Sequence, residues 1–185
     1  GTRAMNDTWS YDGKALEVVT QFKYLGCLLS SSGSFNACIN SLTESGRRGL
    51  FSLKQYFHTN REILPRLQIQ LFNTMILPIL MYCSEVWGLQ NTERIETFHL
   101  SFLKSILCVK KSTPNCFVYG ELGIYPIHIE LKMRVIKFWL KIIRTTTSND
   151  SFIRRIYVQL LFLTITHPNK VSWVSRMGRN FDDYP

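Results

Sequence analysis

Residues that form metal centres and hydrolytic active sites are scarce and scattered in this chain. None of its five cysteines pairs with another at C-x-x-C spacing, and its four histidines lie far apart. No Walker-type phosphate loop, G-x-S-x-G turn or H-E-x-x-H motif occurs. The acidic residues are spread thinly, and their sole adjacent pair is Asp182-Asp183. We therefore expect neither a metal site nor a catalytic residue in this chain.

Long apolar runs are also missing. The two longest, around residues 71–83 and 156–166, are interrupted by polar residues or proline, and a spanning helix needs about 20 apolar residues. The first residues are polar and do not form a signal peptide. The odd, unpaired set of cysteines is typical of a reducing compartment. We expect a soluble protein without a membrane partner, located inside the cell in the nucleus or cytoplasm.

Positive charge, in contrast, is abundant. The chain has 185 residues, with 22 Lys and Arg against 13 Asp and Glu, which gives a net charge of +9. Such a balance favours polyanionic partners or anionic membrane surfaces, although a basic solvated surface explains it equally well. Hydrophobic residues make up 45% of the chain, enough to bury the core of one domain or of one domain with an appendage.

The N-terminal segment has the pattern of a β-hairpin. Two short strand-like stretches flank Asp12-Gly13, a dipeptide that favours positive φ at both turn positions. A two-residue loop pairs Tyr11 with Lys14, and therefore Trp9 with Leu16. We expect a third strand over residues 22–29. Gly26 interrupts that strand, which indicates either a bulge or the close approach of another backbone.

From residue 35 the spacing of apolar residues changes to three and four, which predicts helices. The first spans about 35–57, with a possible kink at Gly46, and one of its faces carries almost no side-chain volume. This small-residue face consists of Ala37, Ser41, Ser45 and Gly49. Such a face requires a close neighbour, either another helix or a nucleic-acid groove. The pattern alone leaves both interpretations open.

Further helices are expected at about 65–87, 92–109 and 127–144. Pro78 should kink or split the first of them, because it removes a backbone hydrogen bond. After a linker over 145–149, residues 151–166 predict a last, very apolar helix. The expected fold class is α+β and mainly α: a short N-terminal antiparallel hairpin or three-stranded piece, followed by a helical bundle and further helices.

The helix over 127–144 carries two stripes. One is apolar and should face the core. It consists of Ile129, Met133, Ile136, Leu140 and Ile143. The other is a basic stripe, which is either the solvated face of the helix or a track for nucleic acid. The basic stripe consists of Arg134, Lys137, Lys141 and Arg144.

Several of these features occur in a familiar order. The segment Phe22-Lys23-Tyr24-Leu25-Gly26 precedes the helical tract that ends in Tyr82-Cys83-Ser84-Glu85-Val86-Trp87. Thr2-Arg3-Ala4-Met5 comes before the first of these motifs, and Thr113-Pro114 and Glu121-Leu122-Gly123 follow the second. This order, over roughly residues 2–144, resembles the end of a non-LTR (LINE-type) retrotransposon reverse transcriptase. Cys83 stands where that family usually has a glycine, and Gly1 where it has a lysine.

The resemblance implies a division of the chain. Residues 1–34 correspond to the end of the palm, with Tyr24, Leu25 and Gly26 as its primer grip. Residues 35–112 correspond to the helical thumb, residues 113–145 to a basic region after it, and residues 146–185 to a linker, an apolar helix and a tail. The implied contacts to the primer-template are Arg47, Arg48, Gly49 and Lys54 of the first helix, together with the basic stripe.

The resemblance also implies what is missing. In a complete enzyme, an upstream palm and fingers would supply carboxylates for two Mg²⁺ ions. Asp182-Asp183 lies after the thumb and directly follows Phe181, unlike the aromatic-x-Asp-Asp turn of such polymerases. We expect a truncated RNA-directed DNA polymerase fragment that holds primer-template but is inactive alone. The alternatives are a stand-alone nucleic-acid-binding module and a helical protein-interaction domain with incidental charge.

Overall fold

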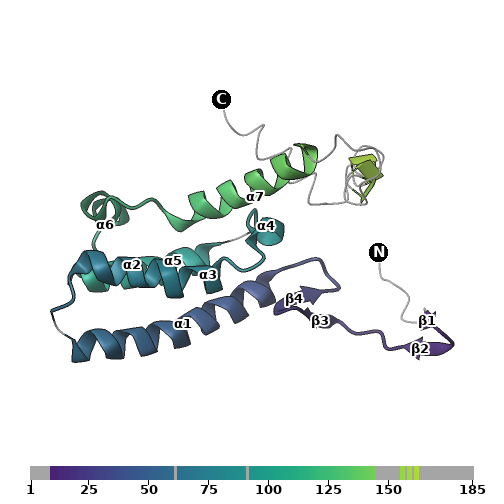
Figure 1. Ribbon diagram of the computed structural model, residues 1–185, viewed down its shortest axis with the longest axis horizontal. Helices are drawn as coiled ribbons and strands as arrows, with labels where there is room; N and C mark the ends of the chain where they lie inside the picture. Colours follow the sequence, from purple (N-terminus) through teal and green to yellow (C-terminus); the bar gives the residue numbers. More distant parts are fainter. Residues whose placement is uncertain are drawn as a thin grey trace.

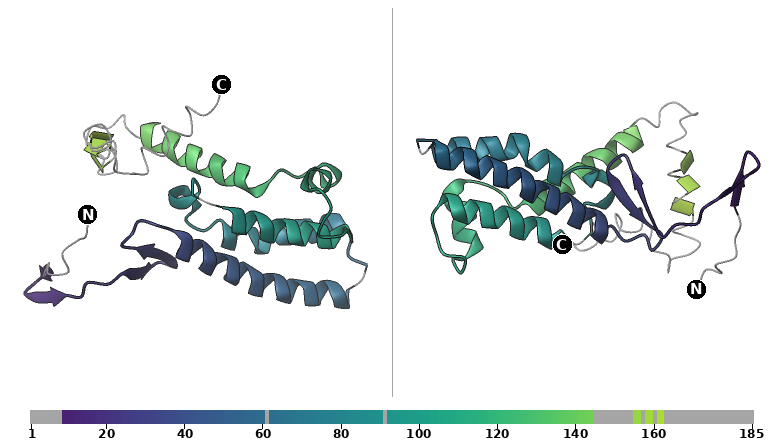
Figure 2. Two further views of the ribbon diagram at one scale, coloured as in Figure 1. Left: turned by 180° about the vertical axis from the view of Figure 1, so that it is seen from behind. Right: turned by 90° about the horizontal axis from the view of Figure 1, so that it is seen from below.

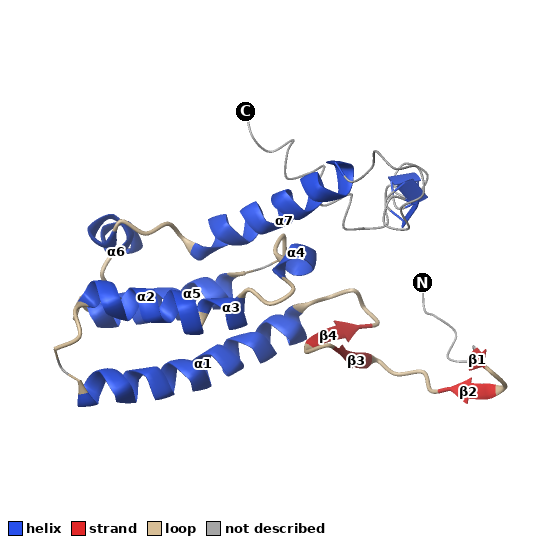
Figure 3. Ribbon diagram, viewed as in Figure 1, coloured by secondary structure: helices blue, strands red, loops and turns tan. Residues whose placement is uncertain are grey.

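The computed structural model describes residues 9–60, 62–90, 92–144, 155–156, 158–159 and 161–162. Strands occupy only the N-terminal part of this region, and helices occupy the rest (Figure 3). The strands are β1 (Trp9–Tyr11), β2 (Lys14–Leu16), β3 (Gln21–Tyr24) and β4 (Cys27–Ser30). The helices are α1 (Asn36–Thr59), α2 (Pro65–Met75), α3 (Leu77–Leu80), α4 (Ser84–Trp87), α5 (Glu93–Ile106), α6 (Asn115–Leu122) and α7 (Ile127–Arg144). The predicted mainly helical α+β class is confirmed.

The helices are arranged in three layers (Figure 1). Helix α1 forms one outer layer, α2, α3 and α5 form the middle layer, and α7 lies on the other side of that layer. Two further views show the same arrangement and the β1–β2 hairpin, which projects away from the helices (Figure 2). The strands therefore extend from one end of the helical body.

The first hairpin has the predicted register. Trp9 pairs with Leu16 and Tyr11 with Lys14, in antiparallel orientation. Asp12 and Gly13 have φ angles of 50° and 70°, so both turn residues take the left-handed conformation that this dipeptide favours. Local turn chemistry was sufficient to predict this element.

The expected single strand over 22–29 is wrong. The chain reverses at Leu25-Gly26, where φ is 45° and 86°, and β3 pairs with β4 from Gln21↔Ser30 to Tyr24↔Cys27. Gly26 is therefore a turn residue of a second hairpin and does not form a bulge. The two hairpins are separate two-stranded sheets. Leucine rarely adopts positive φ, and this conformation needs support from the surrounding structure.

Helix α1 packs on the middle layer at van der Waals distance. A Cβ atom placed on Gly46 would lie 2.6 Å from Leu80 Cδ2, and one on Gly49 would lie 2.8 Å from Ile76 Cδ1. The helix is continuous through both glycines. Another helix is the close neighbour at this part of α1.

The middle layer contains the core. Phe72 and Phe102 stack with ring centroids 4.3 Å apart, and Trp87 is fully buried and donates a hydrogen bond from Nε1 to the Tyr82 carbonyl, 2.9 Å away. Pro78 breaks the long helical tract as predicted, since α2 ends at Met75 and α3 at Leu80.

Helix α7 uses a different face from the one predicted. Ile127, Leu131 and Val135 are its buried residues. The predicted apolar stripe lies on the opposite side of the helix, because successive residues turn by about 100°. Met133 in that stripe is 45% exposed and Leu140 is 38% exposed. The prediction was wrong because the helix carries two apolar stripes and the longer one was taken for the core face.

Four predictions lie partly or wholly outside the described residues, and the linker expected over 145–149 is one that lies outside them entirely. Residues 2–5 and Asp182-Asp183 lie outside them entirely. Of the expected apolar helix over 151–166, residues 155–156, 158–159 and 161–162 are described, and these are helical.

Candidate nucleic-acid interface

The tip of the second hairpin is attached to the helical body by one tyrosine. The Tyr82 hydroxyl donates a hydrogen bond to the carbonyl oxygen of Leu25. A Cβ atom at Gly26 would lie 3.4 Å from Tyr82 Cε1. Tyr24 and Leu25 remain 58% and 72% exposed. The segment expected to form the primer grip is thus a turn whose peptide group is held against the end of α3.

A groove lies between this turn, α1 and α3, with a volume of about 470 Å³. Lys23 and Gly26 of the hairpin, Ser41, Leu42 and Ser45 of α1, and Pro78, Ile79 and Tyr82 line it. Glycine and two serines give this part of its wall little side-chain volume. The structure therefore places two features that sequence analysis identified separately, Gly26 and the small-residue face, in one groove.

The small-residue face of α1 has two different neighbours. Gly49 faces Ile76 and does not line the groove. Ser41 and Ser45 line the groove and are not covered by a helix at that point. Helix packing thus accounts for Gly49, whereas Ser41 and Ser45 line an open groove.

The three predicted cations of α1 are all exposed but point in different directions. Arg48 is on the groove side and donates a hydrogen bond from its guanidinium to Ser45 Oγ, 3.0 Å away. Arg47 and Lys54 lie on the opposite edge of the exposed face, by the periodicity of the helix. Arg47 Nε is 3.5 Å from Glu44 Oε2 and lines a second hollow, between α1 and α5.

The basic stripe of α7 is not brought to this surface. Helix α7 and helix α1 lie on opposite sides of the middle layer (Figures 1 and 2). Arg134 and Glu130 form a long ion pair, with 4.0 Å between Nε and Oε1. Such a partly exposed pair contributes little to stability. A single rigid ligand of short length cannot contact the α1 cations and this stripe together.

A polar cluster that the sequence analysis missed ties α7 to the middle layer. Glu96 of α5 accepts hydrogen bonds from the Tyr119 hydroxyl and from the His128 backbone N–H, 3.0 Å away, and its Oε2 lies 3.1 Å from His128 Nδ1. Burial acts to raise the pKa of Glu96, but the bonds from Tyr119 and His128 outweigh it and lower the pKa. Burial and the Glu96 acceptor raise the pKa of Tyr119. No local motif could show this cluster, because its members are distant in sequence.

His99 is a buried core residue. Its ring stacks on Phe72 with centroids 5.5 Å apart, and its side chain is almost inaccessible to solvent. Burial lowers the pKa of His99 to about 4, while nearby Glu96 acts weakly in the opposite direction. The histidine is therefore neutral at physiological pH, in agreement with a structural role.

The five cysteines comprise a buried pair, the partly buried Cys83 and two exposed single residues. Cys27 of β4 and Cys38 of α1 are buried with sulfur atoms 3.4 Å apart, and burial together with Cys38 raises the pKa of Cys27 to about 12. Cys108 and Cys116 are exposed. Among the described residues, no group of three His, Cys, Asp or Glu side chains is placed to hold a metal ion.

Within the described part of the chain, every helix is too short or too polar to span a lipid bilayer.

Comparisons with known proteins found no counterpart: no family model, curated protein or solved structure matches the chain. A functional proposal for this chain consequently depends on the order of its motifs and on the geometry of the groove.

Proposed function

We propose that the chain is the C-terminal part of a LINE-type reverse transcriptase, and that it holds the primer-template in the groove between the β3–β4 turn and α1. The observation that carries the proposal is the meeting of Gly26 with Ser41 and Ser45 in one groove. Two segments that the family resemblance assigns to primer grip and thumb form its two walls.

The chemistry of the groove suits a nucleic-acid backbone. Its small side chains leave room for a sugar-phosphate chain to approach the protein backbone closely. Lys23 lines the groove and Arg48 adjoins it through Ser45, so cations are available for phosphates. Contacts of this kind read shape and charge, so the binding should show little sequence preference.

Cys83 supports the resemblance at a point where the sequences differ. It stands where the family usually has a glycine, and its φ angle of 55° lies in the left-handed region that glycine adopts most easily. A left-handed backbone at this position would explain the family's preference for glycine there.

The exposed strands support the proposal that an upstream palm and fingers are missing. Trp9, Tyr11 and Phe22 are 63%, 76% and 55% exposed, although they are large and apolar. An exposed apolar surface of this kind is typical of an interface that another part covers. In the complete enzyme, that upstream part would supply the carboxylates for two Mg²⁺ ions, and the chain alone would not incorporate nucleotides.

Binding of an RNA–DNA hybrid to variants of the groove tests the proposal. Ser45→Leu fills the groove without changing charge, so we expect the affinity, measured by fluorescence anisotropy, to fall about tenfold or more while the salt slope stays unchanged. Ser52→Leu, on an exposed turn of the same helix outside the groove, is the matched control. Equal affinities for both variants and the parent would contradict the proposal, provided that thermal melts show both variants folded.

A helical protein-interaction domain is the second candidate, and one observation favours it. The outward stripe of α7 leaves Met133, Leu140 and Ile143 at least 38% exposed, as expected of a surface for a protein partner. Salt dependence distinguishes the candidates. Binding through Z phosphates weakens with salt at a log-log slope of about −0.9Z on duplex DNA, whereas apolar docking does not.

A further inference from the structure

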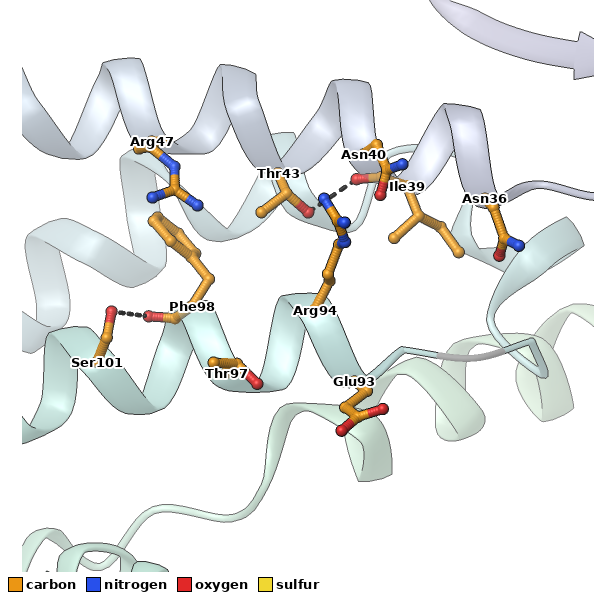
Figure 4. A pocket seen from close by; sticks show the side chains of 10 residues that line it. All are labelled: Asn36, Ile39, Asn40, Thr43, Arg47, Glu93, Arg94, Thr97, Phe98 and Ser101. Carbon is orange, nitrogen blue, oxygen red and sulfur yellow. Dashed lines mark hydrogen bonds between the residues drawn. The ribbon is translucent and has the colours of Figure 1, made fainter. Parts of the chain in front are cut away.

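A second hollow lies on the opposite edge of the exposed face of α1 from the groove. It has a volume of about 640 Å³ and separates the N-terminal halves of α1 and α5 (Figure 4). Helix α1 contributes Asn36, Asn40, Thr43 and Arg47 to its wall, and α5 contributes Arg94 and Ser101. Of its two arginines, Arg47 is among the primer-template contacts that the family resemblance implies.

The two arginines approach the hollow from opposite sides. Arg94 points from α5 toward α1, and Arg47 points from α1 toward α5 (Figure 4). Among the described residues, no carboxylate oxygen lies within 4.0 Å of the Arg94 guanidinium. Glu93 also lines the hollow, but its carboxylate points away from α1 in the same view.

The ion pair of Arg47 does not remove it from this site. Its partner Glu44 is on the same helix, and the two side chains are 64% and 54% exposed. An ion pair with that exposure is screened by water and contributes little, so a phosphate held by two guanidinium groups can compete with it. Arginine also has the planar donor pattern that matches two phosphate oxygens.

The floor of the hollow is less accessible to water than its rim. Ile39, Thr43 and Phe98 are buried, and the Thr43 hydroxyl donates to the Ile39 carbonyl at 2.7 Å. Above this floor the Asn36 and Asn40 amides add N–H donors to those of the arginines. Positively charged donors around a partly dry floor favour an anion with several acceptor oxygens.

We propose that the hollow between α1 and α5 is a phosphate-binding site in which Arg47 and Arg94 hold the same phosphate group. The phosphate belongs either to a nucleic-acid strand or to a free nucleotide. The first of these, a phosphate of a nucleic-acid strand, rests on the proposed function. A strand held in the groove would have to cross the exposed face of α1 to reach the hollow. Binding of a free nucleotide in the hollow does not depend on the groove.

Removal of one guanidinium tests the site in the full chain. Arg94→Gln is compared with the parent and with Arg66→Gln, which removes the same charge from an exposed position on α2 outside both hollows. The ligands are an RNA–DNA hybrid, a single-stranded oligonucleotide, AMP and inorganic phosphate, titrated at several salt concentrations. Arg94→Lys keeps the charge but loses the planar donor pair.

For a strand phosphate, Arg94→Gln should weaken hybrid or single-strand binding about tenfold and lower the salt slope by about one unit, while Arg66→Gln changes neither by as much. Arg94→Lys should recover the slope but only part of the affinity. For a free nucleotide, AMP should bind the parent and Arg66→Gln, and its affinity should fall about tenfold in Arg94→Gln.

Equal effects of Arg94→Gln and Arg66→Gln on every ligand would overturn the site, since charge alone would then account for the loss. If Ser45→Leu abolishes hybrid binding while Arg94→Gln does not change it, the proposed phosphate site in the hollow is wrong and the proposed binding in the groove is supported. If no nucleic acid binds but AMP or phosphate binds in an Arg94-dependent way, the phosphate site in the hollow is supported and the proposed function is wrong. Should Arg94→Gln not fold, the exposed Arg47→Gln replaces it in the same comparison.

Discussion

Helices α1 and α7 show that two basic, amphipathic helices can be used differently in one molecule. Helix α1 buries one face on the middle layer and has hollows along both edges of its exposed face. Helix α7 also buries one face, but its opposite face is an apolar stripe instead of a polar surface. The surface features of α1 therefore suit a small or extended polar ligand, and those of α7 suit an apolar partner.

The largest expected effect is a loss of stability that differs between the two apolar faces of α7. Leu131 is fully buried, whereas Leu140 on the same helix is 38% exposed. Leu131→Ala should lower the free energy of unfolding by about 2–5 kcal/mol, because it leaves a cavity. Leu140→Ala should lower it by less than about 1 kcal/mol. Urea unfolding of both variants measures the difference, and equal losses would mean that the outward stripe of α7 is covered.

A second prediction concerns the layer that α1 and α7 share. The pKa of His99 is about 4 in the folded chain, whereas the ordinary value for histidine is 6.5. As the pH falls, His99 is therefore protonated first in the unfolded chain. The contribution of neutral His99 to the free energy of unfolding is therefore fully present above pH 6.5. It should fall by about 3 kcal/mol as the pH is lowered to 4. The lowered pKa of Glu96 adds a further loss below its ordinary value of 4.5.

Chemical denaturation at a series of pH values measures this loss. His99→Leu removes the titrating ring, so its stability should change much less between pH 6.5 and 5. Tyr119 and Glu96 are unchanged in this variant and continue to titrate at their own pH. A His99→Leu variant with the same slope as the parent between those pH values would show that another group is responsible.

The smallest predicted effects are the changes in stability on replacing two glycines with alanine, and these changes have opposite signs. Gly46→Ala should destabilise the chain, because its Cβ would meet fully buried Leu80 at 2.6 Å and overpacking costs about 1–3 kcal/mol. Gly120 lies in α6, and none of the described heavy atoms is within 4 Å of a Cβ placed there. Gly120→Ala should therefore stabilise by up to about 1 kcal/mol through helix propensity. A stabilising Gly46→Ala would show that α1 is not held tightly against α3.

The sequence predicted features that depend on neighbouring residues. Asp12-Gly13 indicated a hairpin and its register, and Pro78 indicated a break in the second helical tract; both are confirmed. Leu25-Gly26 was missed as a turn because leucine seldom occupies a left-handed position. That turn is held by the Tyr82 hydroxyl, which is far away in sequence.

The candidate site was predicted in its parts but not in its assembly. Gly26 and the small residues of α1 were identified from the sequence, whereas their meeting in one groove depends on how the hairpin rests on Tyr82. Arg47 and Arg94 belong to different helices, so only the packing of α1 beside α5 could place them around one hollow. The Glu96 cluster likewise requires α5, α6 and α7 to be in position.

The sequence by itself determined the change from strands to helices near residue 35, the excess of positive charge and the first hairpin, because each depends on local backbone preference or on composition. Tertiary structure alone decided which apolar stripe of α7 is buried, which part of the small-residue face of α1 is covered, and which cations face a common hollow. A helical pattern shows which residues share a face, but it does not show which face a neighbour will cover, since burial depends on the free energy of packing the whole chain.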